Sequence, residues 1–319
     1  MATRSRRLLL PLVAVLLLAG GCGLFSGDKS APPPLERTTL RVGVGNAIDT
    51  APLRLAVADG RFNRAGLKID LVEEGSGDGL AKLASGDLDI AFANDVSMFR
   101  AAAGGTALQL QGEAYTAGSG TMGLVTLANS PYTDPGAKKA PTIAVDMLDD
   151  LSTLAARSVL GTAGVDPTKI TFYQCPYDQM TKALNDGEAD AAWMVEPYIT
   201  KAEKELGAQV LADGARGATQ NFPVSAYASG RVFAQANPRT LALFRQVLGD
   251  AQEYAADPAV VRSALPRFSS IDATSASLIA LGTYPTSLNA IRLQRVADLM
   301  HNAGALADRL DVQSLLPRG

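Results

Sequence analysis

The sequence predicts an α/β protein of two similar lobes, each with a mainly parallel central sheet flanked by helices, hinged around a cleft. Three observations lead to this prediction. A motif in the first third of the chain recurs further along it. Short β-branched runs alternate with helical stretches in both copies. A leader and a proline-rich spacer precede the first copy, so the fold should begin near Thr38.

Residues 1–21 have the pattern of a secretion signal. A basic head is followed by the apolar core Leu8–Leu18 and then by the small residues Ala19–Gly21. The apolar core is shorter than the roughly 18–20 residues that cross a bilayer, so a retained transmembrane helix is the weaker alternative.

Cys22 is the predicted lipid-attachment site. Ala19-Gly-Gly-Cys22 resembles the lipobox of bacterial lipoproteins, whose cysteine is lipidated and becomes the mature N-terminus, although an aliphatic residue is commoner at the position of Ala19. The resemblance implies a lipid anchor on the extracytoplasmic face of the cell membrane. A plain secreted protein that keeps a cysteine is the alternative. Residues 22–37, with the run Ala31–Pro34, would form the lipidated tether.

An internal repeat predicts the architecture. Leu83–Asp95 and Leu184–Glu196 share the pattern Leu-x-polar-Gly-acid-x-Asp-x-Ala-aromatic-x-x-acid. The same offset aligns two further pairs of runs: Leu40–Val44 with Pro141–Val145, and Lys68–Val72 with Lys169–Tyr173. Three elements in register indicate two sibling βαβαβ units rather than a long solenoid.

Helices are expected between the strands, at Pro52–Ala58 in the first copy and Leu151–Leu160 in the second, with right-handed crossovers. After the second copy, Val224–Gly230 has the pattern of a strand. Helical segments follow it: Pro238–Ala255, Pro258–Leu265 and Leu288–Asn302. We assign these segments to the first lobe. Lobe I then comprises residues 38–127 and 223–319, and lobe II comprises residues 128–222.

The strand ends locate the predicted site, because ligands of open α/β sheets bind beyond the carboxyl ends of the strands. Helix N-termini at these ends leave backbone N–H groups free to face a ligand. The first copy has its strand ends at Gly45-Asn46, Gly75–Gly77 and Asn94-Asp95, and the second at Asp146-Met147, Pro176-Tyr177 and Val195-Glu196. The predicted ligand-binding residues are Asn46, Thr50, Ser76, Gly77, Asn94, Asp95, Tyr115, Asp146, Tyr177, Glu196, Tyr198 and Tyr227.

Several candidates have a structural alternative. Thr50 and the pair Asn94-Asp95 are also residues that cap helices. Glu196 is the sharpest candidate because a carboxylate and the ring of Tyr198 fall together at a strand end, although a capping glutamate and a packed tyrosine are the alternative. Trp193 is favoured as a core residue.

These features together resemble the type II periplasmic binding proteins of ABC importers, in their nitrate, sulfonate, taurine and thiamine-precursor group. The resemblance covers nearly all of the mature chain, and its weak single motifs are specific in their order and spacing: Ala51-Pro-Leu53, Gly75–Asp78, Leu83–Ala91, Ala183–Ala192 and Glu196-Pro197. It implies a monomeric substrate-binding protein of a transport system. Such a protein closes by a hinge on a small-molecule ligand and presents it to an ABC permease in the membrane.

Other function classes are less well supported. The one histidine, His301, lies in a helical run, Cys175 is the only cysteine besides Cys22, and the sequence has neither a metal-binding cluster nor a Gly-x-Ser-x-Gly motif. The sequence therefore predicts no catalytic residue, metal or cofactor. The net charge of −3 gives no basic excess for nucleic acid. An extracytoplasmic ligand-sensing receptor subunit is the main alternative, and a thiamine-pyrimidine-synthase-like enzyme is the weakest one.

The charge of the ligand follows from the acids at the predicted strand ends. These acids are Asp49, Asp95, Asp146, Asp149, Asp178 and Glu196, and no arginine or lysine is expected among them. Helix N-termini favour anions, but a ring of carboxylates repels them. The sequence therefore favours a neutral or cationic small organic molecule, such as an amine or a heterocycle.

Overall fold

The computed structural model describes residues 33–74 and 78–318. Contacts divide the chain at Pro34, and the folded unit is Leu35–Gly319. The predicted sites Cys22, Ser76 and Gly77 lie outside the described residues.

Lobe I contains five strands. They are β1 (Thr39–Val44), β2 (Lys68–Glu73), β3 (Ala91–Asn94), β4 (Leu108–Thr116) and β10 (Pro223–Gly230). β1 and β2 pair in parallel, β10 pairs antiparallel with both β3 and β4, and a parallel bridge from Val42 to Ile90 links the two groups. The spatial order is therefore β2-β1-β3-β10-β4.

Lobe II contains the same arrangement in one sheet. Its strands are β5 (Met122–Thr126), β6 (Thr142–Val145), β7 (Thr171–Gln174), β8 (Ala191–Val195) and β9 (Gln209–Asp213), in the order β7-β6-β8-β5-β9. β6 is parallel to β7 and β8, and β5 is antiparallel to β8 and β9. The repeat aligns β1, β2 and β3 with β6, β7 and β8, so the predicted α/β architecture of two sibling lobes is confirmed. The sheets are mixed rather than mainly parallel, because β10 and β5 enter them antiparallel.

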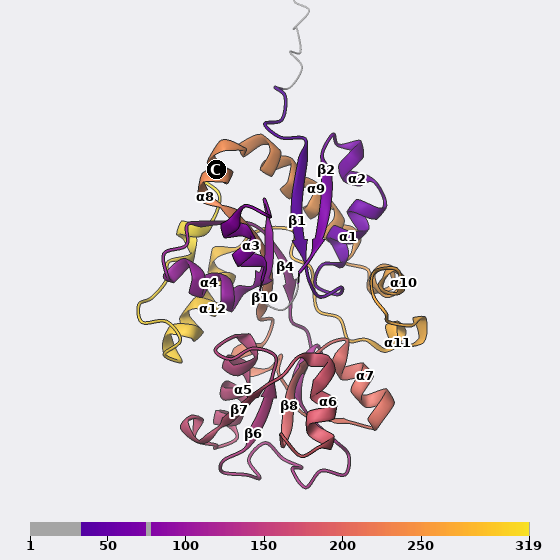
Figure 1. The fold of residues 1–319 in the computed structure, drawn as a ribbon, viewed down its shortest axis with the longest axis vertical. Coiled ribbons are helices and arrows are strands. Elements are labelled where there is room, and N and C mark those ends of the chain that lie inside the picture. The colour runs from indigo at the N-terminus through magenta and orange to yellow at the C-terminus, as the bar shows by residue number, and fades with distance from the viewer. Residues whose placement is uncertain (1–32, 75–77, 319) are drawn as a thin grey trace, which may run out of the picture. The chain divides into compact units, whose positions relative to one another are not determined.

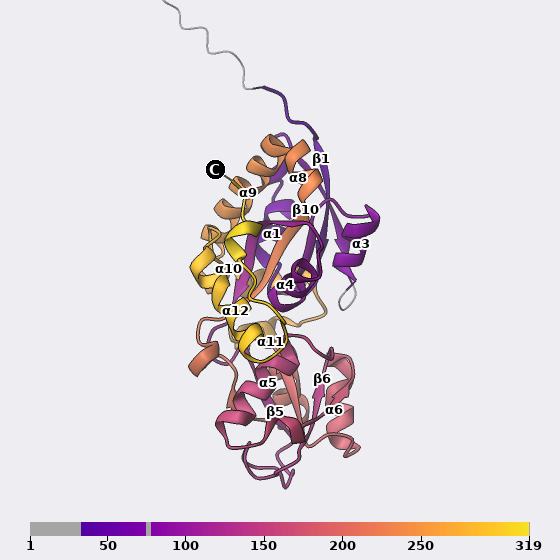
Figure 2. The ribbon, with the colours of Figure 1, turned by 90° about the vertical axis from the view of Figure 1, so that its left-hand side faces the viewer.

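β5 lies in the second sheet, although the sequence assigned residues up to 127 to lobe I. Each lobe receives its antiparallel inner strand, β5 or β10, directly after the chain crosses from the other lobe. The crossings are residues 117–121 and 214–222, which join the two lobes in Figures 1 and 2. The Ser119 hydroxyl donates to Asp213 Oδ2 at 2.7 Å and links the two crossing segments.

Helices flank both sheets. Lobe I carries α1 (Ala51–Ala58), α2 (Arg61–Arg64), α3 (Gly79–Ser85), α4 (Asp95–Ala103), α8 (Arg231–Ala236), α9 (Pro238–Tyr254), α10 (Pro258–Phe268), α11 (Ala273–Leu278), α12 (Ala290–Asn302) and the 3₁₀ turn η3 (Val312–Leu315). Lobe II carries α5 (Leu151–Thr162), α6 (Tyr177–Asn185), α7 (Tyr198–Leu206) and the 3₁₀ turn η1 (Pro167–Lys169), and η2 (Gly217–Thr219) lies in the second crossing.

The C-terminal helices pack on lobe I. Phe62 of α2 stacks on Phe244 of α9 with ring centroids 5.7 Å apart, and both rings are fully buried. Proline opens α9 and α10 in the first turn, where its missing N–H costs nothing. Burial of such rings contributes about 1.5–3 kcal/mol each, so the first and last thirds of the chain stabilise one another.

The loop after α11 lies against the first crossing. Thr116 and Thr283 exchange backbone hydrogen bonds of 2.9 and 3.0 Å. A Cβ atom on Gly282 would lie 2.0 Å from the carbonyl oxygen of Thr116, so only glycine permits this approach. The loop is therefore fixed to the chain that joins the lobes.

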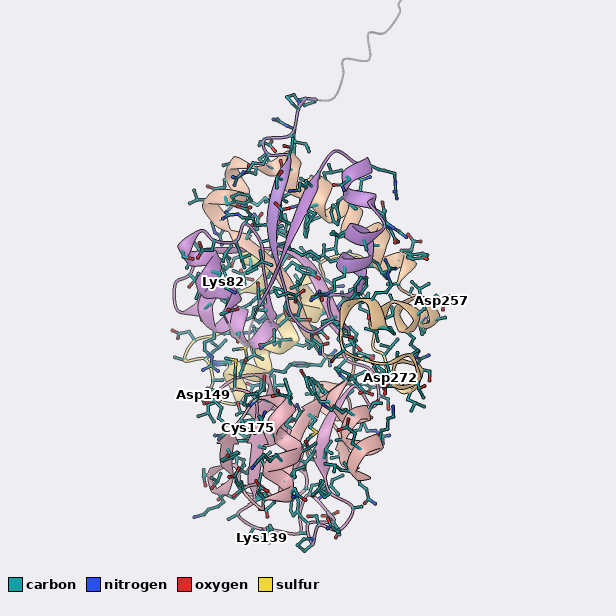
Figure 3. All side chains as sticks on the ribbon, turned by 45° about the vertical axis from the view of Figure 1, so that its right-hand side comes forward. Lys82, Lys139, Asp149, Cys175, Asp257 and Asp272 are labelled. Atoms are coloured by element: carbon teal, nitrogen blue, oxygen red, sulfur yellow. The ribbon has the colours of Figure 1, made fainter. Side chains whose placement is uncertain are left out.

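Residues set aside as structural by the sequence are placed accordingly. Trp193 is fully buried in lobe II. Cys175, labelled in Figure 3, is a free thiol buried in a hydrophobic cluster of the same lobe. His301 lies exposed near the end of α12 and its Nδ1 is 3.2 Å from the carbonyl oxygen of Leu306. Within the described residues, no helix has the length and apolarity to span a membrane.

Candidate functional site

A cavity of about 1100 Å³ lies between the two lobes. Lobe I contributes residues at the carboxyl ends of β1, β2 and β3, which include Gly45–Asp49, Glu73-Glu74 and Asn94. Lobe II contributes the matching residues after β6, β7 and β8, which include Asp146-Met147, Tyr177-Asp178 and Glu196–Tyr198. The carboxyl ends of both parallel strand sets therefore face one cavity, which is large enough for a small organic molecule.

The structure brings most of the predicted residues to this cavity. Those that line it are Asn46, Asn94, Tyr115, Asp146, Tyr177, Glu196 and Tyr198. Thr50, Asp95 and Tyr227 do not line it. The seven lining residues come from both lobes, so a molecule in the cavity would contact both.

Two asparagines of lobe I reach across to lobe II. The Asn46 amide donates to the carbonyl oxygen of Glu196 at 3.0 Å, while its Oδ1 accepts from the Ile48 N–H at 2.9 Å. The Asn94 amide donates to Asp150 Oδ2 at 2.7 Å, and its Oδ1 caps α4 by accepting from the Ser97 N–H at 2.8 Å. Each asparagine therefore uses its amide oxygen within lobe I, in a turn for Asn46 and as the cap of α4 for Asn94, and its amide nitrogen for the bond to lobe II.

Glu196 is already well bonded within the protein. Its Oε1 accepts from the Thr200 hydroxyl at 2.8 Å and from the Ala280 N–H of lobe I at 2.9 Å, and its Oε2 accepts from the Thr200 N–H at 3.0 Å. Burial raises the pKa of this carboxyl, while these donors lower it. A carboxylate offers about four acceptor positions, so most of those of Glu196 are occupied. Its main contacts cap α7 and join the lobes.

Two stacked tyrosines and an aspartate form the floor of the cavity in lobe II. The Tyr177 and Tyr198 rings are 5.0 Å apart at an angle of 18°. The Tyr177 hydroxyl hydrogen-bonds the Asp146 carboxyl, and burial raises the pKa of both groups. A ring face beside a carboxylate suits a flat or cationic group.

The lobe I side carries two carboxyls that burial affects strongly. Desolvation raises the pKa of Asp49 to about 7, although the Ser225 hydroxyl donates to its Oδ2 at 2.8 Å. Desolvation also raises the pKa of Glu74 to about 7. Both side chains line the cavity, so its charge should change near neutral pH.

The family of the chain follows from comparison with known proteins. The model of the NMT1-like family matches residues 33–267, which is most of the chain. The chain belongs to the NMT1-like family. No curated protein sequence matches it.

Solved structures with this fold include sulfonate- and nitrate-binding proteins. The NMT1-like chain is similar to the periplasmic aliphatic sulphonate-binding protein SsuA from Escherichia coli, with 20% identity, coverage of 88% of this chain and 92% of that one, and a TM-score of 0.71. It is also similar to the alkanesulfonate-binding protein SsuA from Xanthomonas axonopodis pv. citri bound to MOPS, with 21% identity, coverage of 90% of this chain and 100% of that one, and a TM-score of 0.73. The periplasmic nitrate-binding protein NrtA from Synechocystis PCC 6803 has 14% identity to this chain, coverage of 89% of this chain and 86% of its own, and a TM-score of 0.72. At these identities the likeness shows the shared fold.

Three predicted residues lie in the interior of lobe I of this NMT1-like chain. Tyr227 is 1% exposed and packs against Phe92 and Phe244, because it lies two residues deeper in β10 than Ser225, which does line the cavity. Thr50 is fully buried, and its hydroxyl donates to the Asn46 carbonyl at 2.8 Å and accepts from Arg54 Nε at 2.9 Å.

Asp95 is also fully buried, and neither of its carboxylate oxygens has a hydrogen-bond partner. Burial, reinforced by the charges of Glu113 and Asp49, raises its pKa well above the usual range. Asn94 caps α4 in its place.

Other cavity residues were missed by the sequence analysis. Asp150 caps α5 in a capping box and accepts from Asn94 and from the Ser97 hydroxyl, at 2.7 and 3.0 Å. The string Asp150-Leu-Ser-Thr153 after a strand end was the available signal. Basic residues also line the cavity, contrary to the expectation of none: Arg54, Arg100, Lys201 and Lys204. Arg54 was detectable as the one charge in an apolar helix.

The described residues include no group of histidine, cysteine and acidic side chains that could hold a metal ion. The polar groups of the cavity instead bond one another across the lobes or face its interior. The arrangement is equipped to hold a small molecule between the two lobes.

Proposed function

We propose that this chain is the solute-binding component of an ABC import system. In this role it captures a small organic molecule between its lobes, closes by a hinge and presents the molecule to a membrane permease. The observation that carries the proposal is one cavity lined by the matching strand ends of two duplicated lobes. Two chain crossings join these lobes, an arrangement suited to hinge closure. The SsuA and NrtA proteins with this fold are described as sulfonate- and nitrate-binding.

The contacts between the lobes fit the proposed closure. They lie on several sides of the cavity: Asn46 to Glu196, Asn94 and Ser97 to Asp150, Glu196 to Ala280, and Lys204 to Asp272. The last pair, at 3.2 Å, lies at the lobe boundary marked by Asp272 in Figure 3. Each hydrogen bond contributes about 0.5–1.5 kcal/mol between neutral groups and about 1.5–3 kcal/mol to a carboxylate, and the exposed ion pair contributes about 1 kcal/mol or less, so the lobes can separate reversibly.

We further propose that the ligand is neutral or cationic. Among the described residues, nine carboxyl side chains line the cavity against four basic ones. Arg54 is held by Glu73 at 2.6 Å, and Lys204 is held by Asp272. Arg100 and Lys201 are left to balance the remaining acids. A sulfonate or nitrate would therefore meet more repulsion than attraction here, whereas an amine or a cationic heterocycle could lie on Tyr177 beside Asp146.

We also propose that a lipid on Cys22 anchors the mature protein to the membrane. Changing Cys22 to Ser should then release the protein from the membrane fraction into the soluble one. Unchanged fractionation would remove the lipid anchor from the proposal and leave ligand capture untouched.

A thermal-shift screen tests capture directly. The set should include amines, amino acids, pyrimidines, flavins, sulfonates and nitrate. A ligand at a hundred times its dissociation constant stabilises a protein by about 2.7 kcal/mol, which shifts a melting temperature clearly. We expect responses among cationic or neutral compounds. A response to sulfonates or nitrate alone would contradict the proposed ligand charge and leave the transport role intact.

A further inference from the structure

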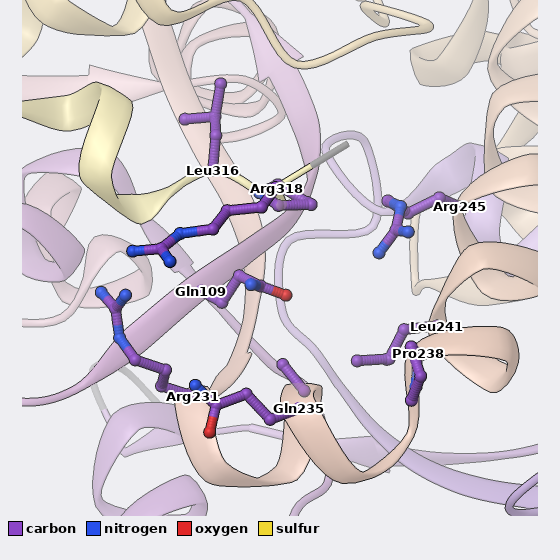
Figure 4. Close-up of a pocket in the computed structure, with 10 residues that line it drawn as sticks. Gln109, Arg231, Gln235, Pro238, Leu241, Arg245, Leu316 and Arg318 are labelled. Atoms are coloured by element: carbon purple, nitrogen blue, oxygen red, sulfur yellow. The ribbon is translucent and has the colours of Figure 1, made fainter.

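A second pocket lies in lobe I and is lined by arginines. It has a volume of about 360 Å³, at the low end of the roughly 300–1,000 Å³ of small-molecule sites. The residues that line it are Gln109, Arg231, Ala234, Gln235, Pro238, Leu241, Arg245, Leu316, Pro317 and Arg318. Three are arginines and none is acidic. Figure 4 shows Arg231 and Arg318 on one side of Gln109 and Arg245 on the other.

Arg245 is held in place by a buried amide. Gln111 is fully buried; its Nε2 donates to Gln109 Oε1 at 3.0 Å and to the Ser229 hydroxyl at 2.9 Å. Its Oε1 is thereby turned toward Arg245 and accepts from Nη1 at 2.7 Å. This bond uses one of the five N–H donors of the guanidinium. No other acceptor for Arg245 is present in the part of the chain that the structure describes.

Within the described residues, the other two arginines also have no carboxylate partner. Arg231 Nη2 donates to two carbonyl oxygens, of Leu108 at 3.3 Å and of Ser314 at 3.2 Å, which orient the side chain without neutralising it. Arg318 has no hydrogen-bond acceptor among residues 33–74 and 78–318. Elsewhere in lobe I, arginines meet acids, as Arg41 meets Asp89 and Arg292 meets Glu113.

Arg245 is the arginine of this pocket that is affected by desolvation. Burial lowers the pKa of the Arg245 guanidinium, which is the sign of a charge that lacks a compensating partner. Guanidinium groups present parallel N–H donors that match two oxygens of one phosphate group. An oxyanion between the arginines would accept these donors and offset the desolvation of Arg245.

We propose that the pocket formed by Arg231, Arg245 and Arg318 binds a phosphate-type oxyanion. The chemistry suits either free phosphate esters or the phosphodiester of an anionic phospholipid. The site is separate from the cavity between the lobes, and the two lining sets share no residue.

The position of the pocket is compatible with a phospholipid headgroup as the source of the oxyanion. α8 and the C-terminus lie at the same end of lobe I as the start of β1 (Figure 1). The Glu36 carboxylate accepts from the Thr240 N–H at 2.9 Å, two residues after Pro238 of the pocket. The residues between Cys22 and Leu35 span at most roughly 45 Å when extended. If the proposed lipid on Cys22 is present, this length is the greatest distance that Leu35 can reach from the membrane surface.

The test uses the full chain with Cys22→Ser, so that an acyl chain cannot cause membrane binding. Inorganic phosphate is titrated by calorimetry, and vesicles of phosphatidylcholine, with and without phosphatidylglycerol, are used for sedimentation. Both experiments are repeated with Arg231→Gln, Arg245→Gln and the double variant. Arg64→Gln is the matched control, because Arg64 is an exposed lobe I arginine outside the pocket. The melting temperature of each variant checks folding.

We expect phosphate binding that weakens about tenfold in each single variant, weakens further in the double variant and is unchanged in Arg64→Gln, as loss of a charge-assisted contact predicts. Sedimentation with phosphatidylglycerol that the double variant abolishes would identify a lipid headgroup as the source. Phosphate binding without such sedimentation would identify a free oxyanion. The proposal fails if neither probe binds, or if Arg64→Gln weakens binding as much as the pocket variants. Ligand responses of the cavity between the lobes are read separately, so either proposal can fail alone.

Discussion

Asp95 and Glu196 occupy equivalent positions in the two lobes and have opposite surroundings. Each directly follows the third strand of its repeat. Asp95 is fully buried with both oxygens unpartnered, whereas Glu196 accepts three hydrogen bonds, one of them from the other lobe. The duplicated backbone therefore fixes where an acid stands, and the neighbouring side chains decide what it does.

The same divergence affects the two walls of the cavity. Lobe I presents the amides of Asn46 and Asn94, both engaged across the cleft. Lobe II presents the stacked Tyr177 and Tyr198 beside Asp146. The repeat pairs Gly45 with Asp146. The carboxylate that is proposed to contact a cationic ligand in lobe II therefore has a glycine at the equivalent position in lobe I. We infer that lobe II supplies most of the ligand selectivity and lobe I most of the closure.

The largest predicted effect is on the free energy of unfolding, which should change in opposite directions when Glu196 or Asp95 is replaced. Glu196→Ala should lower the free energy of unfolding by about 2–4 kcal/mol, because it removes three hydrogen bonds and leaves buried donors unpaired. Asp95→Leu should raise it by about 1–2 kcal/mol, because it removes a buried polar group that has no partner. Denaturant unfolding at pH 7 measures both. A loss of stability in both variants would show that Asp95 is satisfied after all.

The next prediction concerns the lobe II wall. Asp146→Asn should weaken binding of a cationic ligand from the screen by about 1.5–3 kcal/mol, as expected for a partly buried charge pair. Asp178→Asn is the matched control, since Asp178 lines the same cavity but is exposed. Its effect should stay within about 0.5 kcal/mol, as for an exposed ion pair. Equal affinities for the wild type and Asp146→Asn, by calorimetry, would contradict the assignment of Asp146.

A smaller effect concerns pH and the lobe I wall. The folded-state pKa of Asp49 is raised to about 7, above its unfolded value, so the folded state holds the proton longer. Stability should then fall as the pH rises from about 4, the unfolded-state pKa, to about 7, by up to about 1.4 kcal/mol per pH unit, and level off above that. Glu74 adds a slope of the same sign. Asp49→Asn should reduce the slope of unfolding free energy against pH. An unchanged slope would show that Asp49 is ionised throughout this range.

The repeat made much of the fold predictable, and the exceptions have physical reasons. Strands β1 to β3 and β6 to β8 follow local patterns that recur at one offset. The sheet that β5 joins could not be predicted, because local alternation does not say which edge a strand reaches after a crossing. The antiparallel pairing of β5 with β8 is set by contacts distant in sequence.

For the site, the sequence located strand ends but not the direction of side chains. Asn94 and Asp95 are adjacent, yet one turns to the cavity and the other into lobe I. Tyr227 does not reach the cavity because it lies in the middle of β10 rather than at the end of the strand. Arg54 and Asp150 were missed because their bonds, to Glu73 and to Asn94, join segments far apart in the chain.

Hydrogen exchange with a ligand from the screen tests most directly whether both lobes hold one molecule. The account predicts slower exchange at once in two sets of backbone amides, those of 45–49 in lobe I and those of 146–147 and 177–178 in lobe II, with the amides of the arginine pocket unchanged. Protection limited to one lobe, or found only away from the cavity, would contradict capture between the lobes.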